Sequence, residues 1–444
     1  MTPPARVDRK RPEFSRPTLP SEPTGGRLAF WALVAYTVVI VLSPQLYFTW
    51  LEPLRIAALI GWLAIASCAA GRLAAGQWVV EMSRELWLAV GLAVWALFTI
   101  PFSLHPGGSF TTLTDGYAKV LVLLWLIGHV VTTERRYRTV AITLSLIAVP
   151  IAASAINQYI SGEFLEGSVS RIRGFESTLA GNPNDLAMTL NLILPFTVAI
   201  VRTDRRPAVK FVFSLMAAAF IVAIVCTFSR GGFITLVVTG LLYVRADVKH
   251  RRAWALVLVI AVVLGIAMAP RSYLSRMETI TSIDADVTGS SQQRWMVIEA
   301  AVTSVLRRPI FGAGLGSSVI AVTDIGGGRW SDVHNVYLVY AVDLGLPGLV
   351  LFLLLALGVL RKARLVRQRS TGMADRLVLH RLAEATEISL LAFMVAGMFT
   401  PGAYLAYFYY FAGLALALGR LPGKQFGEGG PVGRASLRAD RPLK

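Results

Sequence analysis

The sequence predicts an all-helical protein that crosses a membrane about twelve times. Of its 444 residues, 55% are hydrophobic and only 16% are charged, whereas a soluble domain has about 45–50% apolar and about 25% charged residues. The mean hydropathy is +0.61, and the apolar residues gather in runs long enough to span a membrane as helices. This composition excludes a soluble enzyme, a nucleic-acid-binding protein and a secreted disulfide-stabilised domain.

Twelve apolar runs account for the predicted spans. They cover residues 28–43, 53–71, 86–102, 117–132, 138–160, 185–202, 208–228, 231–245, 253–269, 334–360, 386–402 and 403–420. The ninth and tenth runs are separated by the long loop 270–333. Residues 1–27 are rich in proline and basic side chains, and we expect them and residues 421–444 to be disordered tails. The membrane domain therefore occupies residues 28–420.

The distribution of charge predicts how the chain crosses the membrane. The formal net charge is +17, which in a polytopic membrane protein indicates basic cytoplasmic loops. If residues 1–27 are cytoplasmic and the spans alternate, most of the 43 Lys and Arg residues lie on the cytoplasmic side. Both termini are then cytoplasmic, and the loop 270–333 lies on the outer face.

Four arginines depart from this rule and are candidates for an anion site on the outer face. Arg171 and Arg173 precede the sixth span, Arg230 lies in the hairpin between the seventh and eighth, and Arg294 lies in the long loop. Guanidinium groups bind phosphate through paired hydrogen bonds and keep their charge. Each arginine also has a structural interpretation, because Arg230 can reach the lipid headgroups and the other three can be solvated surface charges.

The long loop and its end carry further patterns. Apolar residues recur at helical spacing in 292–306, which predicts an amphipathic helix at the membrane surface. Residues 309–316 contain three alternating glycines and predict a turn, since no strand precedes them as a dinucleotide site requires. His334 opens the tenth span as either an interfacial polar residue or a general base. Asp284 and Asp286 form a D-x-D pattern without further ligands, so no metal site is predicted there.

The segment 181–185 leads into the sixth span. Its residues Asn182 and Asn184 indicate a turn followed by a helix cap. Together with the arginines and His334, this segment places polar groups and glycine-rich turns on one face of a membrane bundle. Such a face suits a lipid substrate that bears phosphate.

The order of these motifs resembles the O-antigen ligase and polymerase superfamily. The resemblance rests on Gly181-Asn182-Pro183-Asn184-Asp185-Leu186-Ala187, Ser229-Arg230-Gly231-Gly232, Arg294-Trp295, Pro309-Ile310-Phe311-Gly312-Ala313-Gly314-Leu315-Gly316, His334-Asn335-Val336-Tyr337-Leu338 and Gly345-Leu346-Pro347-Gly348-Leu349. It implies a helical bundle of the lipid-linked glycosyltransferase type in the bacterial inner membrane, with a periplasmic active site. Many members carry a glutamate where this chain has Asp343, whose side chain is one methylene shorter, so we predict no role for Asp343.

The resemblance also implies a reaction and its participants. A glycan moves with inversion from undecaprenyl pyrophosphate to a hydroxyl of the lipid A core, in a ligase, or of a growing polysaccharide, in a polymerase. Neither a metal nor another cofactor is expected, and a chain-length regulator is a candidate partner. Arg230 and Arg294 would contact the pyrophosphate, and His334 would activate or orient the acceptor. The implied substrate-binding residues are Arg171, Arg173, Asn182 and Asn184.

Two other classes of protein are alternatives. One is a twelve-span envelope polysaccharide transporter or flippase, which usually has repeated halves and ionisable residues near the membrane midplane. Here no repeat is detected, and most charges lie at the ends of the spans, with Arg55 and Lys119 as exceptions. The other is an envelope scaffold, which would not need the arginine and histidine pattern. The sequence therefore favours an enzyme.

Overall fold

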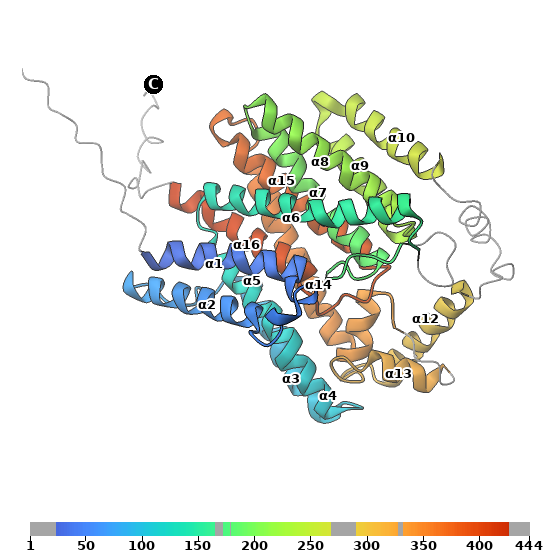
Figure 1. The fold of residues 1–444 in the computed structure, drawn as a ribbon. Helices are drawn as coiled ribbons and strands as arrows, with labels where there is room; N and C mark the ends of the chain where they lie inside the picture. The colour runs from blue at the N-terminus through green and yellow to red at the C-terminus, as the bar shows by residue number, and fades with distance from the viewer. Residues whose placement is uncertain (1–23, 165–171, 178, 268–289, 327–331, 426–444) are drawn as a thin grey trace, which may run out of the picture.

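The computed structural model describes residues 24–164, 172–177, 179–267, 290–326 and 332–425, which form a helical bundle (Figure 1). Within these residues the only β contact is an isolated bridge between Phe164 and Ile172. The helices are α1 (Thr24–Leu42), α2 (Ile56–Ala74), α3 (Arg84–Thr99), α4 (Pro106–Thr111), α5 (Ala118–Val130), α6 (Glu134–Ser161), α7 (Pro183–Thr203), α8 (Pro207–Cys226), α9 (Arg230–Ala246), α10 (Arg251–Ala267), α12 (Ser290–Arg307), α13 (Ser318–Ile325), α14 (Val336–Arg369), α15 (Leu377–Ala396) and α16 (Ala406–Gln425). The predicted all-helical class is confirmed.

Several of the described helices can cross a membrane. Seven of them are long and apolar enough, namely α2, α3 with its following turn, the continuous segment from α4 to α5, α6, α7, α8 and α14. The other predicted spans overlap α1, α9, α10, α15 and α16, although α15 begins and ends several residues before the predicted run 386–402. Of these, α9 and α10 have only 17 residues each, and α15 contains the buried acidic residues Glu384 and Glu387. The chain is thus a multi-pass membrane protein, while the count of twelve spans and the side of the loop 270–333 stay predictions.

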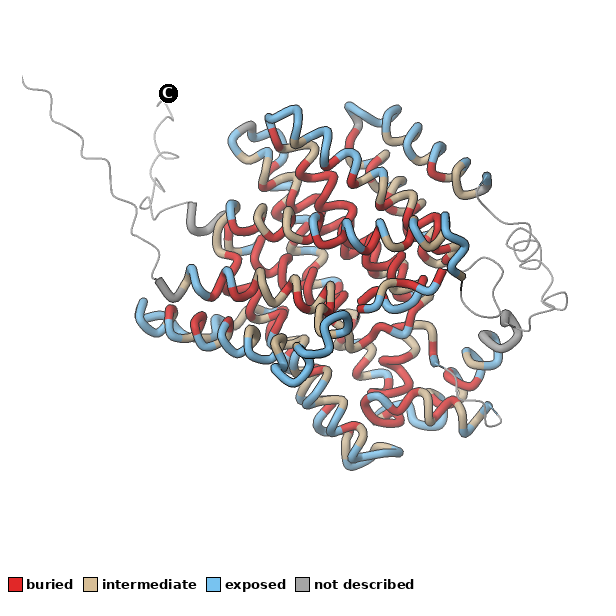
Figure 2. Tube along the Cα trace, viewed as in Figure 1, coloured by how far each residue is buried: buried red, intermediate tan, exposed pale blue. Residues whose placement is uncertain are grey.

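Helix α7 lies at the centre of the bundle. Of its most apolar window 83% is buried, against 17% for the peripheral helix α2, and Figure 2 shows this contrast between centre and edge. Helix α7 packs against α6, α8, α9 and α15. Every residue from Leu186 to Ile200 is buried, so this part of the helix is surrounded by protein on all sides. The N-terminus of α7 is therefore held in place by several neighbours.

Helix α14 is interrupted at Gly345, where φ is +68°. This φ favours glycine, and a Cβ at Gly345 would overlap the carbonyl oxygen of Ile310. The glycine-rich segment 309–316 packs against the interruption. Three backbone hydrogen bonds hold it there, from Ala313 N to Val342 O (2.7 Å), from Gly314 N to Asp343 O (2.9 Å) and from Leu346 N to Pro309 O (2.8 Å). The predicted turn is therefore fixed to α14, and its glycines permit close backbone approach.

Asp343 lies beside this interruption and is fully buried. Its Oδ2 accepts hydrogen bonds from the Gly316 amide (2.9 Å) and the Tyr404 hydroxyl (3.1 Å). Gly316 ends the glycine-rich segment, and Tyr404 precedes α16, so one carboxylate joins three parts of the fold. We predicted no role for Asp343, although an acidic residue inside an apolar run is itself a signal.

The predicted amphipathic helix 292–306 is present within α12. Its side chains Trp295, Ile298, Val302 and Leu306 are exposed, whereas Ala300 and Ala301 are buried. The buried side packs against α13 and α14. An exposed apolar stripe is typical of a helix that lies in a membrane surface.

Candidate functional site

The N-terminus of α7 is organised by the Asn182 side chain. Its Oδ1 accepts hydrogen bonds from the amides of Asn184 and Asp185, both at 3.0 Å, which confirms the predicted cap. Its Nδ2 donates to Asp185 Oδ2 at 2.6 Å. The Asp185 carboxylate is thereby held in the first turn of α7, where the helix dipole favours a negative charge.

The N-terminus of α9 is joined to that of α7. The Ser229 hydroxyl caps α9 by accepting from the Gly232 amide (3.1 Å) and donates to Asn184 Oδ1 (2.8 Å). A Cβ at Gly232 would overlap the Cβ of Ala187, so only glycine permits this approach of the two helices. The Ser-Arg-Gly-Gly motif therefore forms the junction between α9 and α7.

The N-terminus of α14 reaches the same place through the segment that joins α15 to α16. The side chain of Asn335 caps α14, and the Val336 amide donates to the Gly397 carbonyl at 2.7 Å. The same segment contributes Thr400, whose hydroxyl donates to Asp185 Oδ1 at 3.3 Å. A residue of the connecting segment thus contacts the first turn of α7.

His334 directly precedes this cap and has a defined tautomer. Its Nδ1 lies 2.8 Å from the carbonyl oxygen of Asp332. Because a carbonyl only accepts, Nδ1 must carry the proton, and Nε2 of the neutral ring keeps its lone pair. The imidazole also lies close enough to the Asp185 carboxylate to interact with it electrostatically. His334 therefore has the arrangement of a general base with a nearby carboxylate.

The N-termini of α7 and α9 therefore pack together at one end of the bundle, and the N-terminus of α14 is linked to them through residues 397–400. Each helix carries a partial positive charge of about half an elementary charge at this end. Amide N–H groups in the first turns of helices are donors suited to phosphate and other anions. This end of the bundle therefore favours an anionic ligand.

Arg230 adds a full positive charge to this place. It is half-buried in the first turn of α9, and among the described residues its side chain has no ion pair or hydrogen-bond partner. A cation at a helix N-terminus is unfavourable by about 0.3–1 kcal/mol, because it is repelled by the dipole. An anionic ligand would offset this repulsion.

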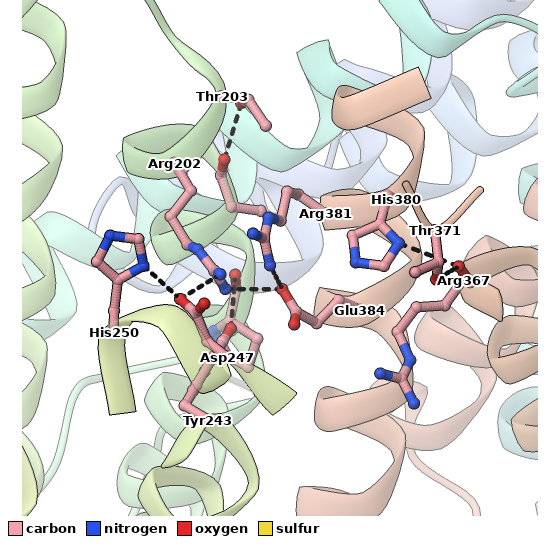
Figure 3. Close-up of polar contacts among 12 residues, drawn as sticks. Arg202, Thr203, Tyr243, Asp247, His250, Arg367, Thr371, His380, Arg381 and Glu384 are labelled. Atoms are coloured by element: carbon pink, nitrogen blue, oxygen red, sulfur yellow. Dashed lines mark hydrogen bonds and ion pairs between the residues drawn. The ribbon is translucent and has the colours of Figure 1, made fainter. Parts of the chain in front are cut away.

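At the opposite end of the bundle, by contrast, Arg202 and Arg381 are paired with carboxylates (Figure 3). There Arg202 pairs with Asp247 and, at 2.8 Å, with Glu384. Arg381 also pairs with Glu384, at 3.0 Å. Buried charges are normally compensated in this way, whereas Arg230 has no counter-charge among the described residues.

Residues 214–353 match the family model described as O-antigen ligase. Over this segment the chain is similar to the O-antigen ligase family. The superfamily resemblance of the sequence motifs is thereby confirmed, and no curated protein matches the sequence at a significant level. The segment that matches the O-antigen ligase family includes Arg230, Arg294 and His334.

The other predicted substrate-binding residues lie before the matched segment. Asn182 and Asn184 shape the junction of α7 and α9 through their hydrogen bonds. Arg173 is exposed, and its amide donates to Gln158 Oε1 at 2.8 Å. The next residue, Gly174, packs directly on Gly181, so Arg173 lies beside the segment that enters α7.

Three residues that were considered in the sequence analysis cannot be placed in the site. Arg171, Asp284 and Asp286 lie outside the described residues. Arg294 lies in α12, and its role stays a prediction. The site that the structure does bring together thus contains Arg230, His334, Asn182 and Asn184.

Two members of the site were not singled out from the sequence. Asp185 was part of the recognised motif but was interpreted only as part of a turn and cap. Thr400 gave no signal, because it is 215 residues away from its partner Asp185. Only the packing of α15 and α16 against α7 brings the two together.

Proposed function

We propose that the chain is a membrane glycosyltransferase that moves a glycan from undecaprenyl pyrophosphate to an acceptor hydroxyl on the periplasmic face of the bacterial inner membrane. The observation that carries the proposal is Arg230, which lies beside the packed N-termini of α7 and α9 and has no counter-charge among the described residues. Pyrophosphate gains negative charge as its bond to the sugar breaks. Cations and amide donors at this place would therefore stabilise the transition state more than the ground state. Arg294, also in the family segment, is the second arginine that we assign to the pyrophosphate.

His334 would accept the proton of the acceptor hydroxyl at Nε2. The acceptor oxygen forms a bond to the anomeric carbon as the bond from that carbon to the pyrophosphate oxygen breaks. Attack from the face opposite the leaving group inverts the configuration. The imidazolium that forms would be stabilised by the nearby Asp185 carboxylate. Arg173 and Arg171 would contact the donor phosphates or sugar, and Asn182 and Asn184 would maintain the shape of the site.

We expect His334→Ala to lower the rate of transfer by about 10²–10⁴-fold while donor binding changes little, since general-base catalysis contributes about that much. Turnover and donor binding would be measured separately on purified protein. Asp185→Asn should give a smaller loss of turnover, because it keeps a side chain of the same size but removes the charge that supports the ring and the hydrogen bond that one carboxylate oxygen accepts. An equal loss of binding and turnover in His334→Ala would contradict a general-base role.

We expect EDTA to leave transfer unchanged, because the proposed charge stabilisation comes from arginines and helix amides. Among the described residues no group of three or more His, Cys, Asp or Glu side chains could hold a metal ion. Transfer would be assayed in membranes before and after chelation, with Mg²⁺ restored as a control. A loss of transfer that Mg²⁺ reverses would contradict the proposed mechanism and direct attention to Asp284 and Asp286.

The acceptor decides between an O-antigen ligase, which we favour slightly, and a repeat-unit polymerase. A deletion strain complemented with the wild type or with Arg294→Ala would be examined for surface glycans and lipid-linked intermediates. Core-only lipid A with full-length polymer left on the carrier identifies a ligase. Loss of long chains with single repeat units remaining identifies a polymerase. A normal pattern with Arg294→Ala would contradict catalysis and favour the transporter.

A further inference from the structure

A cavity of about 270 Å³ lies between α7, α8, α9 and α10. Its lining runs from Leu194 in the middle of α7 to Arg202 near the end of that helix, so it occupies the half of the bundle opposite the candidate site. The walls are mainly apolar. The lining includes Ala218 and Val257, which are exposed on α8 and α10. The cavity therefore opens toward the lipid, and its walls suit a hydrocarbon chain.

One wall of the cavity carries an unpartnered hydroxyl. Thr239 is 1% exposed, and its Oγ1 has no hydrogen-bond partner among the described residues. One turn earlier in α9, Thr235 donates its hydroxyl to the Gly231 carbonyl at 2.8 Å, the usual arrangement in a helix. Buried polar groups are normally hydrogen-bonded. The Thr239 hydroxyl is itself inaccessible, so the cavity presents an essentially apolar wall on this side.

The mouth of the cavity has the character of a membrane interface. Trp254 stacks on Tyr243 with ring centroids 4.6 Å apart, and its indole N–H donates to Asp247 Oδ2 at 3.2 Å. Figure 3 shows Tyr243 and Asp247 beside the ion pairs of Arg202. Trp and Tyr side chains are enriched at the level of lipid headgroups. This end of the cavity is therefore where a headgroup would lie.

The turns around this mouth carry exposed cations. They are Arg205, Lys210, Arg245, Lys249, Arg251 and Arg252, none of which has an ion-pair partner among the described residues. Lys210 is one helical turn before Ser214, and Arg251 is three residues before Trp254, and both of these later residues line the cavity. The neighbouring carboxylates are already engaged, Asp204 with Arg138 and Arg206 and Asp247 with Arg202. The rim therefore carries a net positive charge.

From this combination we propose that the cavity is a binding site for an anionic phospholipid of the membrane leaflet on that side. One acyl chain would fill the apolar cavity. The phosphate would lie against Lys210 and Arg251, whose long side chains can reach over the mouth. The charge of the rim favours a phospholipid with net negative charge over a zwitterionic one. This site is separate from the proposed site of glycan transfer.

The test uses the full-length protein in nanodiscs made of equal parts phosphatidylglycerol and phosphatidylcholine, with retained lipids identified by native mass spectrometry. The wild type should retain phosphatidylglycerol at least about tenfold over phosphatidylcholine. Ala217→Phe should fill the cavity and remove most of the bound lipid. Ala219→Phe is the matched control, because Ala219 is similarly half-exposed on α8 but does not line the cavity. It should retain lipid as the wild type does.

A second pair of variants tests the headgroup without changing the interior. Lys210→Gln combined with Arg251→Gln should reduce the preference for phosphatidylglycerol at least about fivefold. The control, Arg361→Gln with Arg369→Gln, removes two exposed cations from the last part of α14 and should keep the preference. Equal retention of both lipids by the wild type, full retention by Ala217→Phe, or an unchanged preference in the first double variant would each overturn the proposal. So would a polyprenyl phosphate as the retained molecule from native membranes.

Discussion

Replacement of Arg230 by alanine is expected to abolish glycan transfer, with a loss of about 10²–10³-fold or more, while the protein still inserts and purifies normally. Activity should be lost because Arg230 is the charged group beside the N-termini of α7 and α9. The fold should be kept because the Arg230 side chain has no partner among the described residues. Removing one donor that stabilises developing negative charge typically costs about this much. The fold should even be relieved of an unfavourable interaction with the α9 dipole. Transfer would be measured in membranes containing equal amounts of each protein.

The lysine variant separates charge from geometry. Arg230→Lys keeps the positive charge but loses the planar pair of donors, so it should restore transfer only in part. Arg294→Ala should show the same loss as Arg230→Ala if both arginines contact the pyrophosphate, and Arg294→Lys should again rescue incompletely. Wild-type transfer in either alanine variant would contradict the proposed role of that arginine. Poor insertion of Arg230→Ala would instead indicate a structural role.

Gly345→Ala is expected to destabilise the protein by about 3 kcal/mol or more, and so to remove activity through the fold. The added Cβ would overlap the carbonyl oxygen of Ile310, at a φ of +68° that non-glycine residues rarely adopt. Gly312→Ala should act in the same way from the other side, because its Cβ would lie 2.5 Å from the carbonyl carbon of Asp343. The measurement is the thermal unfolding midpoint in detergent, together with the fraction of monodisperse protein.

Gly91→Ala in α3 is the matched control. Nothing lies within 4 Å of a Cβ at Gly91, and alanine is favoured over glycine inside a helix by about 1 kcal/mol. This variant should be as stable as the wild type or slightly more stable, with unchanged transfer. If Gly345→Ala unfolded at the same temperature as Gly91→Ala, the glycine-rich segment 309–316 would not be fixed to α14 as described.

The helices themselves were largely predictable from the sequence. The short run 231–245 is α9, and the division of 386–420 at Pro401-Gly402 corresponds to the segment between α15 and α16. Such boundaries follow from local properties, namely apolar length, caps and helix-breaking residues. The interruption of α14 was not predicted, although the run 334–360 contains the helix-breaking sequence Gly345-Leu346-Pro347-Gly348. The close contact of Gly345 with Ile310 comes from the tertiary structure.

Some residues of the candidate site could be chosen from the sequence, and others were found only in the structure. Arg230 and His334 were chosen from the sequence because each lies at the start of an apolar run, where a charge or a titratable group needs an explanation. Asp185 and Thr400 were not chosen, since their importance rests on a contact across 215 residues. Asp343 was noticed only as a departure from the usual glutamate, and its two hydrogen bonds come from segments on either side of it in the chain.

By itself, therefore, the sequence determined the helical membrane class, the approximate positions of most helices, the superfamily resemblance and the arginine and histidine candidates. These follow from composition, periodicity and short motifs, each contained within a few neighbouring residues. Only the tertiary structure decided that the segment between α15 and α16 contacts Asp185 and links α14 to α7 and α9. It also decided that Arg230 lacks a described counter-charge while Arg202 has two, and that segment 309–316 packs against α14. Those properties arise from contacts between distant segments, and no local pattern encodes which distant segments will pack together.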